Sequence, residues 1–242
     1  MTSGPNEITI DARPSSISLT PASTAVIVID MQNDFATVGG MFERAGIDIS
    51  EIRSAIEPTT QVLAAARDAG MRIVYLKMGF HPDLSDVGSP ESPNWLKHAP
   101  MKVGEEVNAP NGTTGRILVR DTWNTDIINE LTPEPGDVVL YKHRFSGFFE
   151  TPLDEILRAD GVQTLIFVGA TTSVCVDSTV RDAMYRDYHC ILIEDCIAEP
   201  IGAGLPRSNH DATLLVLQIL FGSISDSSKL LVALDRAVVS AT

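Results

Sequence analysis

The chain has 242 residues, of which 44% are hydrophobic and 21% charged, an ordinary composition for one globular domain. Lysine and arginine total 18 against 32 aspartates and glutamates, so the formal net charge is −14. This acidic balance argues against nucleic acid and an anionic membrane surface as partners, because both require a basic face on the protein.

The sequence also indicates a compartment. No apolar run reaches about 18 residues, so we expect no transmembrane helix. Residues 1–14 lack the basic and apolar regions of a secretory signal. The three cysteines, Cys175, Cys190 and Cys196, cannot all pair within the chain. A reducing, cytoplasmic setting is therefore expected.

Strands and helices alternate along the chain. Residues 24–30 (TAVIVID) form a β-branched run typical of a strand buried on both faces, and residues 50–69 have helical apolar spacing that ends at Gly70. The elements expected next are strands at 72–77, 137–142, 162–168, 189–194 and 218–221, and helices at 124–131, 152–159, 175–187, 210–217 and 227–239. This alternation predicts one α/β domain over residues 1–242, with a doubly wound, mostly parallel sheet and helices on both faces.

Residues 79–120 interrupt the alternation. The segment is rich in proline, glycine, serine and asparagine, and it is too long for a simple connector. Loops of this length usually act as lids or binding loops, and the alternative is a surface excursion without a role.

Three residues whose side chains can act in catalysis lie at or just after the ends of predicted strands: Asp30, Lys142 and Cys175. Parallel sheets bind ligands at the carboxyl ends of their strands, so these side chains are expected at one edge. A thiol attacks as thiolate, which a helix start and an ammonium favour, while a carboxylate can accept its proton. The alternatives are a turn-forming aspartate, a solvent-reaching lysine and a small buried cysteine, a role that also suits Cys190 and Cys196. The small residues 169–174 suit an oxyanion hole made of backbone N–H groups.

Three segments, IDMQNDF, YKHRFSGFFETPLDEIL and FVGATTSVCVDSTVRDAMYRDY, resemble the isochorismatase-like cysteine hydrolases, and the resemblance runs from about residue 20 to about residue 225. It implies a catalytic triad of Asp30, Lys142 and Cys175, and a cis peptide between Ala170 and Thr171. It also implies an oxyanion hole made by the backbone N–H groups of Thr171 and Cys175. Family members of this kind suggest a homo-oligomer, either a dimer or a tetramer.

Details of the sequence distinguish branches of the family. The nicotinamidase branch carries an Asp-x-His metal motif with a second histidine, whereas residues 77–86 (KMGFHPDLSD) hold only His81, so we expect no metal and no other cofactor. The isochorismate-cleaving branch lacks the cysteine that is present here. The segments ATVGG, GSPESPNW and RFSGFFETPLDEILR resemble biuret and ureidoacrylate hydrolases most closely. The expected substrate is therefore a small carbamoyl amide: biuret, cleaved to allophanate and ammonia, or alternatively ureidoacrylate or another N-carbamoyl amide.

A pocket for a flat, neutral amide needs an apolar wall and a few amide partners. The aromatic and amide side chains expected to line it are Phe35, Trp95, Phe148, Asn94 and Gln218. Ureidoacrylate also carries a carboxylate, which Arg144 could bind unless it forms a structural ion pair instead.

Two further classes of function remain open. A non-catalytic, ligand-binding family member would be expected to have lost a triad residue, and all three are present. A redox role for Cys175 would require Cys190 or Cys196 within about 6 Å, measured between Cα atoms.

Overall fold

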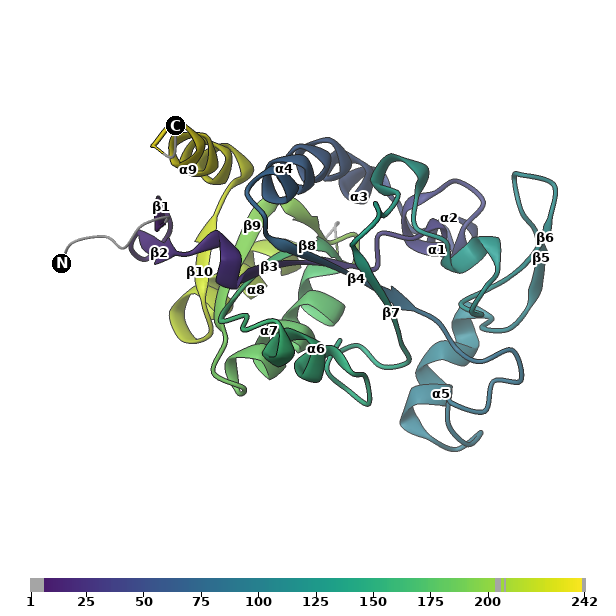
Figure 1. Cartoon of the computed structure of the whole chain (residues 1–242). Helices are drawn as coiled ribbons and strands as arrows, with labels where there is room; N and C mark the ends of the chain where they lie inside the picture. The colour runs from purple at the N-terminus through teal and green to yellow at the C-terminus, as the bar shows by residue number, and fades with distance from the viewer. Residues whose placement is uncertain (1–6, 203–205, 207, 241–242) are drawn as a thin grey trace.

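A six-stranded parallel sheet forms the centre of the molecule, and the computed structural model describes residues 7–202, 206 and 208–240 (Figure 1). The strands are β3 (Thr24–Ile29), β4 (Arg72–Met78), β7 (Val138–Lys142), β8 (Thr164–Ala170), β9 (His189–Ala198) and β10 (Ser223–Ser225). Their order is β10-β9-β8-β3-β4-β7, and each neighbouring pair is parallel. The chain builds outward from β3 in one direction and then returns to its other side with β8. The carboxyl ends of β3 and β8 therefore form the switch point at which such sheets bind ligands.

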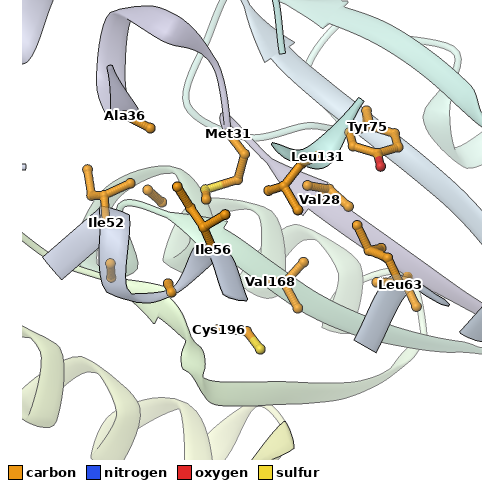
Figure 2. Packing of buried hydrophobic residues seen from close by; sticks show 14 of the residues in the cluster. Val28, Met31, Ala36, Ile52, Ile56, Leu63, Tyr75, Leu131, Val168 and Cys196 are labelled. Atoms are coloured by element: carbon orange, nitrogen blue, oxygen red, sulfur yellow. The ribbon is translucent and has the colours of Figure 1, made fainter. Parts of the chain in front are cut away.

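Helices cover both faces of the sheet (Figure 1). One face carries α3 (Ser50–Ser54), α4 (Ile56–Asp68) and α9 (Ser227–Ser240), and the other carries α6 (Leu153–Ala159), α7 (Asp177–Met184) and α8 (Asn209–Leu220). Successive residues of β3 point to opposite faces, so Val28 packs against α4 while Ile27 and Ile29 pack on the other side. Figure 2 shows Val28 and Val168 from the sheet beside Ile56 and Leu63 from α4. The predicted α/β architecture is confirmed.

Smaller elements complete the described part of the chain. They are the antiparallel pair β1 (Ile8–Ile10) and β2 (Ile17–Leu19), the short helices α1 (Asn33–Ala36) and α2 (Met41–Arg44), and the 3-10 turn η1 (Pro21–Ser23). None of the helices in the described ranges is long and apolar enough to cross a lipid bilayer.

Two predicted elements are wrong. Residues 124–131 form two 3-10 turns, η3 (Trp123–Thr125) and η4 (Asn129–Leu131), because the residues between them pair with the chain after β3: Asp126 O accepts from Asn33 N at 3.0 Å. Residues 218–221 continue α8 and form no strand, since the carbonyl of Leu217 still accepts hydrogen bonds at the helix end. The last strand, β10, begins only after Gly222, which lies against the backbone of β9. The predicted helix over 50–69 is also divided at Ala55 into α3 and α4.

Residues 79–120 have structure of their own. They contain α5 (Pro93–His98), the 3-10 turn η2 (Ala99–Met101) and an antiparallel pair, β5 (Glu106–Asn108) and β6 (Thr114–Arg116). Their buried side chains, among them Phe80, Val87 and Leu118, join the hydrophobic core on the α4 side of the sheet. The segment is thus a packed extension of the fold with short elements of its own, and its role as a lid or binding loop stays a prediction.

Buried Asp34 attaches this extension to the sheet. Its carboxylate accepts from Leu118 N at 2.7 Å, from Met41 N at 3.0 Å and from Asn124 Nδ2 at 2.6 Å. Asp34→Ala would leave three buried donors without an acceptor, so the free energy of unfolding should fall by about 3 kcal/mol in urea denaturation.

Asp48 provides the matched control for Asp34. It is exposed and accepts from Ser50, whose N–H lies at 2.9 Å, so Asp48→Ala should cost about 1 kcal/mol or less. Equal losses for the two variants would contradict the role assigned to Asp34.

Candidate active site

The side chains of Asp30, Lys142 and Cys175 meet at the carboxyl edge of the sheet. Lys142 Nζ lies 2.8 Å from Asp30 Oδ2 and 3.4 Å from Cys175 Sγ. The residues are 1%, 0% and 7% exposed, respectively, so the cluster is enclosed by protein. The three residues expected at one edge are therefore in mutual contact.

Asp30 directly follows β3, in the left-handed backbone region at φ +54° that aspartate tolerates better than most residues. Its N–H donates to Leu76 O at 2.9 Å, and its carbonyl accepts from Gln32 N at 2.8 Å. Burial raises the pKa of its carboxyl group, against the opposing charge of Lys142 and hydrogen bonds from Cys175 and Lys142. Asp30 is consequently a stronger base than an exposed aspartate.

Lys142 ends β7 and extends past β4 to reach Asp30. Its Nζ also lies 3.8 Å from the sulfur of Met78, at the end of β4, and donates to Arg144 O at 3.3 Å. Burial lowers the pKa of Lys142, but the charges and hydrogen bonds of Asp30 and Cys175 raise it more, so the net shift is upward. Lys142 therefore remains an ammonium ion inside the protein.

Cys175 lies in a π-helical turn, η5 (Thr172–Val176), which joins β8 to α7. The sequence predicted a regular helix that starts at Cys175. In the structure Cys175 instead lies two residues before the first residue of α7. The Ala170–Thr171 peptide before this turn is cis, as the family resemblance implied.

The electrostatics of Cys175 differ from the sequence expectation. A helix start and a neighbouring ammonium were expected to lower the pKa of the thiol. Burial and the negative charge of Asp30 instead raise it well above its ordinary value, and Lys142 offsets this only in part. The cluster at rest therefore holds a neutral thiol beside an Asp30–Lys142 ion pair, and the thiolate must form as the substrate is attacked.

Residues outside the predicted set hold this turn in place. Glu199, buried just beyond β9, accepts hydrogen bonds from both the N–H (2.7 Å) and the hydroxyl of Ser173 through Oε2. Thr179 donates from Oγ1 to Cys175 O at 2.6 Å and accepts from Gly147 N at 3.0 Å, linking the turn to the chain after β7. Sequence reasoning missed Glu199 because the strand was expected to end at residue 194, where Glu194 and Asp195 interrupt the apolar run, whereas β9 continues to Ala198. The oxyanion hole at the N–H groups of Thr171 and Cys175 stays a prediction.

Three of the predicted pocket residues have contacts that the sequence did not indicate, and their contact with a substrate stays a prediction. Phe35 packs edge-on against Phe42, with ring centroids 4.8 Å apart, in the core on the α4 side. Phe148 stacks on Tyr188, the residue before β9, with ring centroids 6.0 Å apart. Gln218 lies half-buried in α8 instead of a strand.

Asn94 and Trp95 both lie in α5. The amide nitrogen of Asn94 donates to Val87 O at 2.9 Å, and Trp95 packs against the core on the α4 side. Their contact with a substrate stays a prediction.

Arg144 lies next to the cluster through its backbone, whose carbonyl accepts from Lys142. Its Nη1 donates to Asp86 O at 2.9 Å and to His143 O at 2.6 Å. No carboxylate of the described residues lies within 4.0 Å of the half-buried guanidinium group, so the structural ion pair considered as an alternative is not formed with any of them.

The remaining cysteines do not face Cys175. Cys190 lies near the amino end of β9, and Cys196 lies in the core on the opposite face of the sheet (Figure 2). All three thiols are free. In the described ranges, no group of three or more histidine, cysteine, aspartate or glutamate side chains is arranged to hold a metal ion.

Comparison with known proteins gives consistent likenesses. The isochorismatase domain family matches residues 24–228. Ureidoacrylate amidohydrolase RutB from Methylorubrum extorquens is 42% identical over 219 residues, covering 90% of this chain and 86% of that protein. The protein of the same name from Cronobacter sakazakii is 40% identical over 221 residues, covering 91% and 92%.

Solved structures agree with these likenesses. A cysteine hydrolase from Pseudomonas syringae pv. phaseolicola 1448A has a TM-score of 0.74 at 27% identity, covering 90% of this chain and 95% of that chain. N-carbamoylsarcosine amidase from Thermoplasma acidophilum has a TM-score of 0.61 at 27% identity, covering 85% and 96%. Together with the fold and the cluster at the sheet edge, the family match over most of the sequence shows that the chain belongs to the isochorismatase family.

Proposed function

We propose that the chain hydrolyses an N-carbamoyl amide that carries a carboxylate, with ureidoacrylate as its substrate and Cys175 as its nucleophile. That it is a hydrolase acting on linear amides follows from its family and from relatives named amidohydrolases. The substrate carboxylate is the finer part of the proposal, and the observation that supports it is Arg144. Its backbone carbonyl contacts Lys142, and its half-buried guanidinium group has no carboxylate partner in the described part of the chain.

Charge distinguishes the two substrates considered from the sequence. Biuret is neutral and gains little from a guanidinium group. Ureidoacrylate would place its carboxylate on a group built for bidentate binding of that anion. The relatives named ureidoacrylate amidohydrolase, at about 40% identity, support the same choice.

The first half of the reaction begins with the neutral thiol. As Cys175 Sγ attacks the carbamoyl carbon, its proton passes to Asp30, whose raised pKa makes it an effective acceptor. Lys142 stabilises the developing negative charge on sulfur at 3.4 Å. The backbone N–H groups of Thr171 and Cys175 bind the oxyanion. Asp30 then returns the proton to the terminal nitrogen, the C–N bond breaks, and ammonia leaves.

The second half of the reaction releases the thioester. A water molecule gives its proton to Asp30 and attacks the thioester carbon, the C–S bond breaks, and the sulfur regains a proton from Asp30. The product is an N-carboxylated aminoacrylate, which loses carbon dioxide. The net reaction converts ureidoacrylate and one water molecule into 3-aminoacrylate, carbon dioxide and ammonia.

A substrate panel tests this function. Ammonia release should be fastest from ureidoacrylate and much slower from biuret, N-carbamoylsarcosine and nicotinamide. Arg144→Gln should raise KM for ureidoacrylate about tenfold or more, because the substrate carboxylate loses a charge-assisted hydrogen bond. Turnover of biuret, which has no carboxylate, should be nearly unchanged. Arg158→Gln, at a half-exposed arginine on α6, is the matched control and should change neither. Faster hydrolysis of biuret than of ureidoacrylate would overturn the substrate assignment.

A further inference from the structure

His98 ends α5 between two aromatic rings that belong to the strand ends around the cluster. Its ring centroid lies 5.4 Å from that of Phe80, which follows β4, and 5.6 Å from that of Phe145, which follows β7. The histidine is only 7% exposed, whereas Phe145 is 40% exposed. The imidazole is therefore held in one orientation beside the chain that supplies Lys142.

The hydrogen bonding of His98 determines which ring nitrogen carries the proton. Nδ1 lies 2.7 Å from Asn94 O, and because a carbonyl only accepts, Nδ1 must donate. Burial lowers the pKa of His98, and the charges of Arg144 and Lys142 lower it further, against the opposing bond to Asn94. The ring is therefore neutral, and Nε2 presents a lone pair.

No described residue lies within hydrogen-bonding reach of this lone pair. Among the described residues, Nε2 of His98 is not one of the fully enclosed side-chain atoms that lack a hydrogen bond. Nε2, which has no partner there, must therefore keep contact with accessible space. Phe145 adjoins Arg144, whose carbonyl lies 3.3 Å from Lys142 Nζ, and the charges of Arg144 and Lys142 both act on the imidazole, so His98 lies near the cluster.

The side chains nearest the reacting carbon offer mostly donors. The ammonium of Lys142 and the backbone groups assigned to the oxyanion have only N–H groups to give, and the one acceptor of the cluster, Asp30, is engaged by Lys142 and Cys175. A ureido group presents one carbonyl oxygen but three N–H bonds. An unoccupied acceptor at the edge of the site is what such a substrate requires, since a buried N–H without an acceptor weakens binding.

We propose that Nε2 of His98 accepts a hydrogen bond from the substrate N–H that lies between the carbamoyl carbon and the acrylate. His98 would then be a specificity-determining residue that favours ureido compounds with a hydrogen on this nitrogen over those with an alkyl group. This inference rests on the function proposed above.

The test compares two variants with two compounds. His98→Asn keeps a donor near the position of Nδ1 and removes the acceptor, whereas His98→Gln places an amide oxygen near Nε2. The compounds are ureidoacrylate and its analogue methylated on the internal nitrogen, which cannot donate there. His98→Asn should raise KM for ureidoacrylate about tenfold with a smaller change in kcat, and His98→Gln should recover part of this loss. The inhibition constant of the methylated analogue should stay within about twofold of wild type in both variants.

The outcomes separate this inference from the proposed function. If wild type releases ammonia from ureidoacrylate and His98→Asn weakens both compounds equally, the residue has only a structural role and the inference is wrong. An unchanged KM for ureidoacrylate in His98→Asn also overturns it, with thermal unfolding confirming that the variant is folded. If wild type does not hydrolyse ureidoacrylate at all, the proposed function fails first and the inference fails with it.

Discussion

Cys175→Ser should reduce ammonia release from ureidoacrylate by about a thousandfold or more while leaving the fold intact. A serine hydroxyl is far less acidic than a thiol, so Asp30 cannot take its proton during attack. The buried site around residue 175 accommodates the smaller oxygen without a new clash, and the polar side chains that Sγ meets in the described part of the chain are Lys142 and Asp30. The measurement is kcat/KM for ammonia release, with circular dichroism to verify folding.

The matched control for this substitution is Cys190→Ala. Cys190 is equally buried, but its sulfur contacts only backbone carbonyls, those of Val180 at 3.8 Å and Tyr188 at 3.5 Å. This variant should lose some stability and keep kcat/KM within about twofold. If Cys175→Ser kept a tenth of wild-type activity, the covalent mechanism would have to be abandoned.

Asp30→Asn should have two opposite effects on the same sulfur atom. Turnover should fall by about a hundredfold to ten-thousandfold, because the proton acceptor is gone. Alkylation of Cys175 by iodoacetamide near neutral pH should nevertheless become faster than in wild type. The negative charge of Asp30 helps to raise the pKa of the thiol, and removing it leaves the stabilising ammonium of Lys142 without a competing anion.

Lys142→Met is the complementary variant. Without the ammonium, burial and the Asp30 charge act on the thiol unopposed, so alkylation should be slower than in wild type at every pH. The modified cysteine is identified by peptide mass spectrometry, which separates Cys175 from Cys190 and Cys196. Slower alkylation in Asp30→Asn than in wild type would show that the carboxylate activates the resting thiol, against the electrostatics described here.

The sequence was sufficient to predict where Asp30 and Lys142 lie, because each directly follows or ends a strand that can be recognised from neighbouring residues alone. A β-branched run that ends in Asp30, and another that ends in Lys142, identify strands and the edge at which they finish. The parallel arrangement then brings the two residues to the same edge without further information.

Other features depend on contacts distant in sequence. Residues 124–131 have helical spacing, but hydrogen bonds such as Ile128 N to Met31 O, at 3.1 Å, hold part of them extended. Phe148 could not be assigned to a pocket or to the core before its stacking partner Tyr188 was known. The direction of the thiol pKa shift likewise depends on how deeply Cys175 is buried and how near Asp30 lies, neither of which the sequence states.

Lys142, a member of the proposed triad, lies at the end of β7, which is an edge strand of the sheet. Among the described strands β7 pairs only with β4, and its Val139 is 44% exposed, yet it carries Lys142, the ammonium of the proposed catalytic cluster. Border strands are held by one ladder of hydrogen bonds and open more readily than central ones. If β7 separates from β4, Lys142 leaves Asp30 and the proposed hydrolysis stops, even though β3, β8 and β9 keep their structure.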